Sequence, residues 1–79
     1  MDWRERIVSN PDILVGKPSV KGTRIAVDLI LGWLANGWTH EMILESYTQL
    51  AREDILAGLA FATELMLDEE CTAMHKATA

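Results

Sequence analysis

Apolar positions in the middle of the chain recur at helical spacing. Val27, Ile30, Leu31 and Leu34 lie at i, i+3, i+4 and i+7, which places them on one face of a helix. The dipeptide Asn36-Gly37 supplies a C-terminal stop, because glycine readily adopts the left-handed conformation. The pattern therefore predicts a first helix that begins after residue 26 and ends near residue 36.

Two residues of this first helix need a separate explanation. Gly32 costs about 1 kcal/mol relative to alanine within a helix, and we expect it where another backbone packs closely. Trp33 lies beside the apolar face, where it either extends the core or contributes to a subunit interface, since tryptophan is enriched at interfaces.

A second, two-turn helix has the clearest start signal in the chain. Thr39 is a good N-cap residue, and Glu41 complements the positive end of the helix dipole. Trp38 and Ile43 have the spacing of a hydrophobic staple. The helix is expected to end near residue 47 and to turn an inward face made of Met42, Ile43, Ser46 and Tyr47.

A third and longer helix is predicted from about residue 51 to residue 70. Glu53 and Asp54 suit its N-terminal turn, whereas Ala51 is a poor cap, so we expect its start to fray. Its apolar stripe repeats at intervals of three and four residues and consists of Ile55, Leu56, Leu59, Ala62 and Met66.

The first 26 residues carry a different pattern. Their helix breakers exclude a long helix: Asn10, Pro11, Gly16, Pro18 and Gly22. Between the breaks lie apolar pieces that predict short strands at 7–8, 13–15, 19–20 and 24–25, with turns at 10–12 and 21–23. So small a hairpin must pack on something else to be stable.

Together these elements predict a mainly α fold, a three-helix, helix-turn-helix domain with a short N-terminal β-hairpin element. Residues 1–70 form one domain, with the β and turn element in 1–26 and the helices in 27–70, and residues 71–79 form a flexible tail. A chain of 8.8 kDa buries only about 63% of its surface on folding, so we expect a homodimer.

Charge is divided unevenly along the chain. Residues 1–24 hold five basic and three acidic side chains, a sum of +2, whereas residues 25–79 hold two and nine, a sum of −7, which together give −5. Such asymmetry is typical either of a partner-binding surface or of a solvated helical face. No apolar run is long enough for a membrane span and no secretory signal is present, and a single cysteine excludes an intrachain disulfide, so we expect a cytoplasmic protein.

Catalytic chemistry finds no support in the sequence. His40 and His75 have no partners at ligand spacing, and a metal site needs three or four converging ligands. Cys71 has no activating neighbour beyond His75, and we expect it to be inert. We therefore expect no enzyme activity, no cofactor, no metal and no small-molecule substrate.

The basic side chains Lys17, Lys21 and Arg24 are the candidate contact residues, because they lie on a turn-rich and exposed stretch. They suit nucleic-acid phosphates, and they suit an acidic protein surface equally well. A third alternative is structural, with Gly22 in a strained turn and Arg24 paired with Asp28.

Arg52 is a further candidate, at the start of the third helix. If this helix entered the major groove of DNA, its first turn would present Glu53 and Asp54 beside Arg52, and these carboxylates would be repelled by the phosphates. Any DNA contact is therefore expected at the N-terminal basic stretch. The alternative is an interaction or adaptor module that keeps the fold without binding DNA, whose acidic third helix and tail cover a basic cleft on a partner.

The stretch Gly16-Lys17-Pro18, followed by Gly22-Thr23-Arg24-Ile25, resembles the bacterial domain-of-unknown-function family numbered 433. The resemblance covers about residues 5–67 and is supported by Ile43-Leu44, Tyr47, Leu50 and Asp54-Ile55. The family often has proline at the positions of Ala26 and Thr48, and threonine or serine at that of Ala51. These departures concern the ends of elements and leave the fold unaffected.

The resemblance implies a homeodomain-like or winged-helix-like fold with a short N-terminal β element. It also implies an antitoxin of a VapBC-like toxin–antitoxin pair, with a nuclease toxin of the PIN type as partner. It carries over no catalytic residue.

Overall fold

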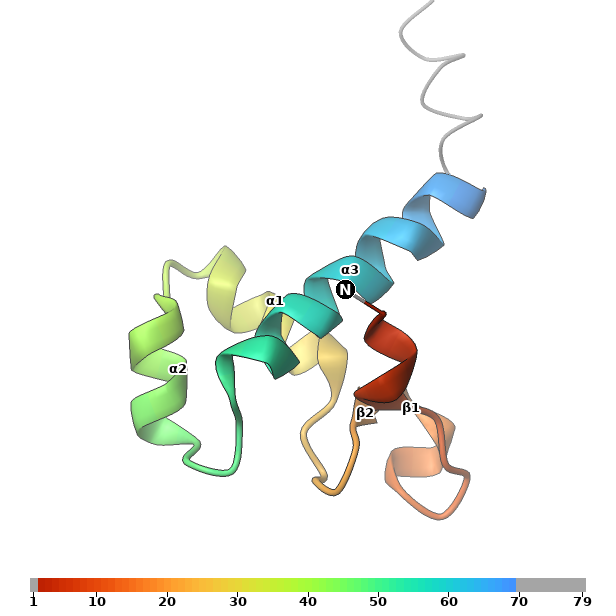
Figure 1. The fold of residues 1–79 in the computed structure, drawn as a ribbon, viewed down its shortest axis with the longest axis horizontal. Coiled ribbons are helices and arrows are strands. Elements are labelled where there is room, and N and C mark those ends of the chain that lie inside the picture. The colour runs from red at the N-terminus through yellow and green to blue at the C-terminus, as the bar shows by residue number, and fades with distance from the viewer. Residues whose placement is uncertain (1, 70–79) are drawn as a thin grey trace, which may run out of the picture.

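The computed structural model of the chain describes residues 2–69. In chain order, it contains a 3-10 helix η1 (Trp3–Glu5), strand β1 (Ile7–Val8), a 3-10 helix η2 (Leu14–Gly16) and strand β2 (Ser19–Val20). The α-helices α1 (Val27–Ala35), α2 (His40–Ser46) and α3 (Arg52–Glu69) follow. This order confirms the predicted mainly helical fold with its small N-terminal hairpin. In Figure 1, α3 runs between the α1–α2 pair and the N-terminal segment that carries η1.

Strands β1 and β2 form an antiparallel pair in which Ile7 lies opposite Val20 and Val8 opposite Ser19. The ladder extends by a single bridge between Ser19 and Ala26, so the predicted strand at 24–25 is wrong. Ile7 and Val20 face the core, which fixes the register, because a slip by one residue would turn both outward.

The predicted strand at 13–15 is also wrong, because this segment forms η2 within the connection that joins β1 to β2. An Asx turn starts it, in which the Asn10 side chain accepts the amide of Asp12 at 2.9 Å. Leu14 and Val15 then take left-handed backbone angles, with φ of 54° and 55°. Val15 is almost fully exposed, so its strand propensity has no sheet or core to act on.

Helix starts are satisfied in three different ways. Thr39 caps α2 as predicted, its hydroxyl accepting the Met42 amide at 3.1 Å. At α1, where Ala26 offers no side-chain cap, the Pro18 carbonyl accepts the Val27 amide at 2.9 Å. At α3 the Asp54 carboxylate accepts the Ala51 amide at 2.8 Å, so a residue inside the first turn replaces the missing cap.

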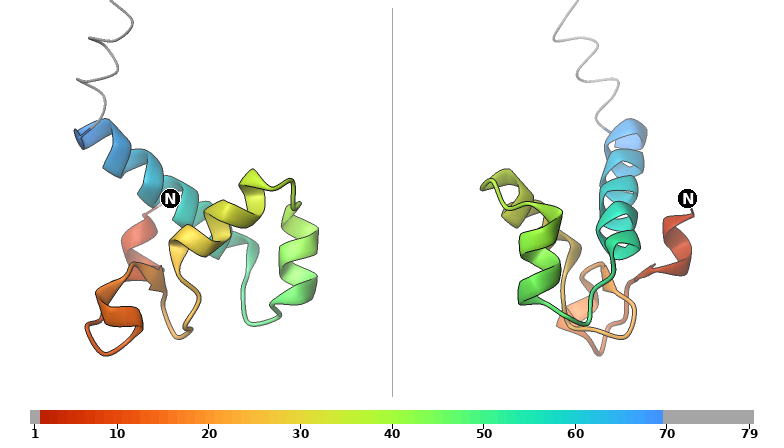
Figure 2. Two further views of the ribbon diagram at one scale, coloured as in Figure 1. Left: turned by 180° about the vertical axis from the view of Figure 1, so that it is seen from behind. Right: turned by 60° about the vertical axis from the view of Figure 1, so that its left-hand side comes forward.

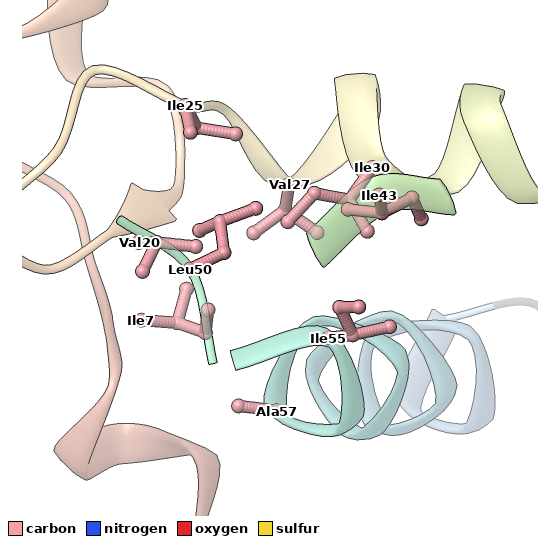
Figure 3. Close-up of a cluster of buried hydrophobic side chains, with 9 residues drawn as sticks. All are labelled: Ile7, Val20, Ile25, Val27, Ile30, Ile43, Leu50, Ile55 and Ala57. Atoms are coloured by element: carbon pink, nitrogen blue, oxygen red, sulfur yellow. The ribbon is translucent and has the colours of Figure 1, made fainter. Parts of the chain in front are cut away.

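The core lies where the hairpin and the three helices meet (Figure 3). Each helix contributes one completely buried isoleucine, namely Ile30, Ile43 and Ile55. Gly58 packs against α1, because a Cβ at this position would lie 3.6 Å from Val27 Cγ1. The expected close packing at Gly32 is wrong: a Cβ there would meet nothing within 4 Å.

The α1–α2 corner is held by stacked aromatic rings. Trp33 stacks on Tyr47 with ring centroids 4.4 Å apart and on Trp38 at 5.5 Å. These rings are half-buried and pack against the core, as one of the two explanations for Trp33 requires. The inward face expected for α2 is only partly right, because Ile43 is buried whereas Met42 and Ser46 are exposed.

Candidate nucleic-acid and partner-binding surfaces

Lys17, Lys21 and Arg24 lie on one short stretch that leads from η2 through β2 toward α1, and we call residues 17–25 the cationic turn. The Val20 amide donates to the Ile25 carbonyl at 3.0 Å, which closes the turn. The Thr23 hydroxyl donates to the Val20 carbonyl at 2.8 Å and accepts the Ile25 amide at 3.0 Å. Gly22 takes a φ of +81°, a conformation that L side chains rarely adopt.

Burial of two apolar side chains directs the basic ones outward. Val20 and Ile25 are in the core, whereas the neighbouring Lys21 and Arg24 are exposed. The Lys21 amide also donates to the Arg6 carbonyl at 2.8 Å, which fixes the turn to β1. The cationic turn is therefore a backbone-pinned element with its charges in solvent.

One of the three cations has an acidic neighbour. Lys17 Nζ lies 2.8 Å from Asp28 Oδ2, and both side chains are more than half exposed, so this pair stabilises the fold little. The structural alternative paired Asp28 with Arg24, but Asp28 binds Lys17 instead. Within residues 2–69, Lys21 and Arg24 form no ion pair.

Arg52 does not join the cationic turn. Its guanidinium lies 3.1 Å from His40 Nδ1 and 3.4 Å from the Glu41 carboxylate, so it links the start of α3 to the start of α2. The pKa of Glu41 is lowered, first because its carboxylate accepts its own backbone amide and second because Arg52 stands beside it. His40 is half-buried beside Arg52.

The first turn of α3 exposes one carboxylate fewer than the sequence predicts. Asp54 does not face solvent beside Glu53, because its side chain is buried and its Oδ1 accepts from Arg6 Nη1 at 3.0 Å. The reason is the N-terminal segment, which folds back against α3 and supplies the cation. The exposed charges of this turn are thus Arg52 and Glu53.

A second long-range contact joins η1 to α3, and we call Trp3, Arg4, Phe61 and Glu64 the N-terminal clasp. Trp3 Nε1 donates to one Glu64 oxygen at 2.6 Å, and Arg4 donates to the other at 2.8 Å. The Trp3 ring meets Phe61 edge-on with centroids 4.9 Å apart. The hydrogen bond from Trp3 and then that from Arg4 lower the pKa of Glu64.

A groove of about 360 Å³ opens between the start of α1 and the second half of α3. We call it the α3 groove. Lys17 and Asp28 lie at its rim, and its other lining residues are Pro18, Val27, Leu31, Phe61, Ala62, Leu65 and Met66. Apart from Lys17 and Asp28, the lining of the groove is therefore apolar.

The described part of the chain contains no group of three or more histidine, cysteine, aspartate or glutamate side chains that could hold a metal ion. Among the helices of residues 2–69, none combines the length and the apolar composition needed to cross a membrane. Cys71, His75 and the tail at 71–79 lie outside the described residues, as does the last residue of the predicted third helix.

The hairpin, the three helices and the exposed cationic turn define a small helical domain. The chain belongs to the family described as "Protein of unknown function (DUF433)", which matches residues 7–62 and so confirms the resemblance. It is also 39% identical over 59 residues to "Uncharacterized protein y4eO" of Sinorhizobium fredii (strain NBRC 101917 / NGR234). That match covers 75% of this chain and 27% of the relative, and no solved structure matches the chain.

Proposed function

We propose that this chain is a non-enzymatic, antitoxin-like helix-turn-helix module of the cytoplasm that contacts DNA through its cationic turn and binds a nuclease toxin of the PIN type. The observation that carries the DNA contact is the cationic turn, because Lys17, Lys21 and Arg24 are all exposed on a backbone-pinned element. The antitoxin role rests on the family resemblance of the same stretch.

The charge on the helices favours a contact through the turn over a contact through α3. The exposed acidic residues of α2 and the first turn of α3 are Glu41, Glu45 and Glu53. Arg52 is the basic residue of these segments, and it is already bound to Glu41. Phosphates would be repelled along this face, whereas at the cationic turn each basic side chain can displace a counterion from the DNA.

The test is binding of a pool of random-sequence duplexes at low salt, measured as the fraction of DNA that the protein retains. We expect wild-type protein to retain the pool and the triple variant Lys17→Ala/Lys21→Ala/Arg24→Ala to lose it, because phosphate contacts do not depend on sequence. Arg52→Ala removes one cation from the other site and is the matched control. Loss of three phosphate contacts reduces the salt slope, d log K/d log[salt], by about 2.7 at about 0.9 per contact.

If wild-type protein retains no DNA at low salt, DNA binding by this chain is contradicted. Equal loss in Arg52→Ala and in the triple variant contradicts the assignment to the cationic turn and moves the contact to α3.

A second candidate function is a protein-interaction module without DNA binding, which the charge of the helices favours. Segment 25–69 holds one basic and eight acidic residues, a net charge of −7, and opposite charge speeds association with a basic RNA-binding cleft. The measurement is inhibition of a purified PIN-type nuclease by the full chain and by a chain lacking residues 68–79. Equal inhibition by both chains would show that the acidic end takes no part in toxin binding.

A further inference from the structure

A second pocket, of about 230 Å³, lies between η1 and the second half of α3, and we call it the clasp pocket. It is lined by Trp3, Arg4, Phe61, Glu64, Leu65 and Asp68. Both views of Figure 2 show η1 beside α3, and each of the two elements supplies one wall. The volume is below the roughly 300–1,000 Å³ of a small-molecule site, so the pocket suits a single inserted side chain.

Both walls are fixed by the sequence around them. One face of α3 carries, at i, i+3, i+4 and i+7, an aromatic, an acidic, an aliphatic and a second acidic side chain, namely Phe61, Glu64, Leu65 and Asp68. On the η1 side, the Asp2 carboxylate accepts the Arg4 amide at 3.0 Å, and the Arg6 amide donates to the Trp3 carbonyl at 2.9 Å. The pocket is therefore formed before a ligand arrives, which lowers the cost of binding.

Arg4 shows which chemistry this site accepts. Its guanidinium carbon lies 4.6 Å from the centroid of the Trp3 ring, and its Nη2 donates to Glu64 Oε1 at 2.8 Å. A planar guanidinium can stack on an aromatic ring and bind a carboxylate at the same time, whereas the ammonium group of lysine is a compact point charge. The rest of the pocket offers a second guanidinium the same two kinds of group, in Phe61 and Asp68.

One carboxylate of the pocket remains available. Glu64 uses one oxygen for Trp3 Nε1 and the other for Arg4. Asp68 is exposed and forms no ion pair within residues 2–69. Three acidic side chains at the clasp, Asp2, Glu64 and Asp68, stand against the single cation Arg4, which leaves a net charge of −2. The pocket therefore attracts a further positive charge.

We infer that the clasp pocket binds an arginine side chain of a protein partner, whose guanidinium pairs with Asp68 and whose stem packs against Phe61 and Leu65. Arginine fits this mixture of groups because its stem is apolar and its head is a cation. Leu65 is 48% exposed, so it has apolar surface to offer the stem. The inference is independent of the proposed DNA contact, because the cationic turn takes no part in it.

The experiment is a titration of the full chain with a short peptide of alternating arginine and glycine, followed by NMR. Trp3 is the reporter, because its indole N–H donates to Glu64 in the pocket. Trp33 and Trp38 are internal controls, since both belong to the α1–α2 corner. We expect the Trp3 indole resonance to shift and to saturate near millimolar peptide, because an exposed ion pair and ring contact are weak. The other two indole resonances stay in place.

Two further peptides test which group is recognised. In the first, citrulline replaces arginine, which keeps the shape of the side chain and removes its charge, and we expect no shift of the Trp3 resonance. In the second, lysine replaces arginine, and we expect weaker binding because the ammonium group does not stack as a plane.

Matched carboxamide variants test the assigned carboxylate. Asp68→Asn and Glu45→Gln each remove one negative charge, and Glu45 is exposed on α2 and does not line the pocket. We expect Asp68→Asn to weaken the binding of the arginine peptide about three- to fivefold, the upper range for an exposed ion pair, and Glu45→Gln to leave it nearly unchanged. Unchanged Trp33 and Trp38 resonances in each variant before the titration show that the fold is intact.

A Trp3 resonance that does not move at millimolar arginine peptide overturns the inference, as does an equal response to the citrulline peptide. Equally tight binding of the lysine peptide overturns the assignment to a guanidinium. Equal weakening by Asp68→Asn and Glu45→Gln would mean that the peptide responds to the acidic charge of the whole chain, which overturns the site. A chain that binds the peptide but retains no DNA contradicts the proposed DNA contact alone, so the two proposals fail separately.

Discussion

Among truncations of a single side chain, we expect Asp54→Ala to lower the free energy of unfolding the most relative to the few atoms it removes. It is 8% exposed, and its two oxygens hold two different parts of the chain. Oδ1 accepts from Arg6, which fixes the segment before β1, and Oδ2 accepts the Ala51 amide, which caps α3. Replacement by alanine removes both interactions at once.

The size of the loss follows from these two contacts. A hydrogen bond to a charged group contributes about 1.5–3 kcal/mol, and loss of a helix cap costs about 0.5–2 kcal/mol. The contacts share one carboxylate and are not fully additive, so we expect Asp54→Ala to lower the free energy of unfolding by about 2–4 kcal/mol. A domain of this length has about 4–12 kcal/mol in total, so the variant is close to unfolding.

Urea unfolding followed by tryptophan fluorescence measures this effect. With a urea slope of about 1 kcal/mol/M for a small domain, the midpoint falls by about 2 M or more. Glu53→Ala is the control, because the neighbouring carboxylate is exposed, and we expect a change within about 0.5 kcal/mol. In a double-mutant cycle, Arg6→Ala and Asp54→Ala couple. Equal midpoints for the Asp54 and Glu53 variants would refute the reasoning.

Three further predictions use thermal or urea unfolding. Gly32→Ala raises the free energy of unfolding by about 1 kcal/mol, because alanine favours the helix and the new Cβ meets nothing within 4 Å. The matched change Gly37→Ala lowers the free energy of unfolding, because φ is +90° at this position. Thr39→Ala costs about 1 kcal/mol through the lost cap of α2, and Thr39→Ser retains most of it. The pKa of Glu64 is lowered in the folded chain, so its contribution is complete above its ordinary pKa of 4.5 and is lost as pH falls through the folded value. Glu64→Gln removes that part of the acid sensitivity.

Each of these has an outcome that contradicts it. If Gly32→Ala lowers the free energy of unfolding, other atoms must cover this side of α1. If Thr39→Ala leaves the free energy of unfolding unchanged, α2 is held by packing alone. An acid limb that is identical in wild type and Glu64→Gln would place the acid sensitivity on other carboxylates.

Helices were predictable because their signals are local. The spacing that begins at Val27 predicted a helix that the structure has at Val27–Ala35, and Thr39 marked the start of α2 to the residue. The segment 13–15 failed because its β-branched residues favour a strand only where a neighbouring strand exists, and here the chain must turn back toward β2. The prediction of close packing at Gly32 was wrong because close packing depends on the whole fold.

The candidate surfaces were predictable only in part, because only some of their contacts are local in the sequence. Exposure of Lys21 and Arg24 follows from a turn between buried Val20 and Ile25, which is local. The contacts of Arg6 with Asp54 and of Trp3 with Glu64 join residues 48 and 61 positions apart, and no periodicity connects them.

One signal did point to these contacts, namely the charge difference between +2 in residues 1–24 and −7 in residues 25–79. Part of that difference is neutralised inside the domain, where Arg4 and Arg6 bind carboxylates of α3. It therefore reports a chain that folds back on itself as well as a surface for partners.

The N-terminal clasp also determines how this domain can be joined to other sequence. Trp3 contacts Glu64, only five residues before the last described residue of α3, so polypeptide enters and leaves the fold at neighbouring points. A unit with adjacent entry and exit can be inserted into a host protein without separating the host's own segments.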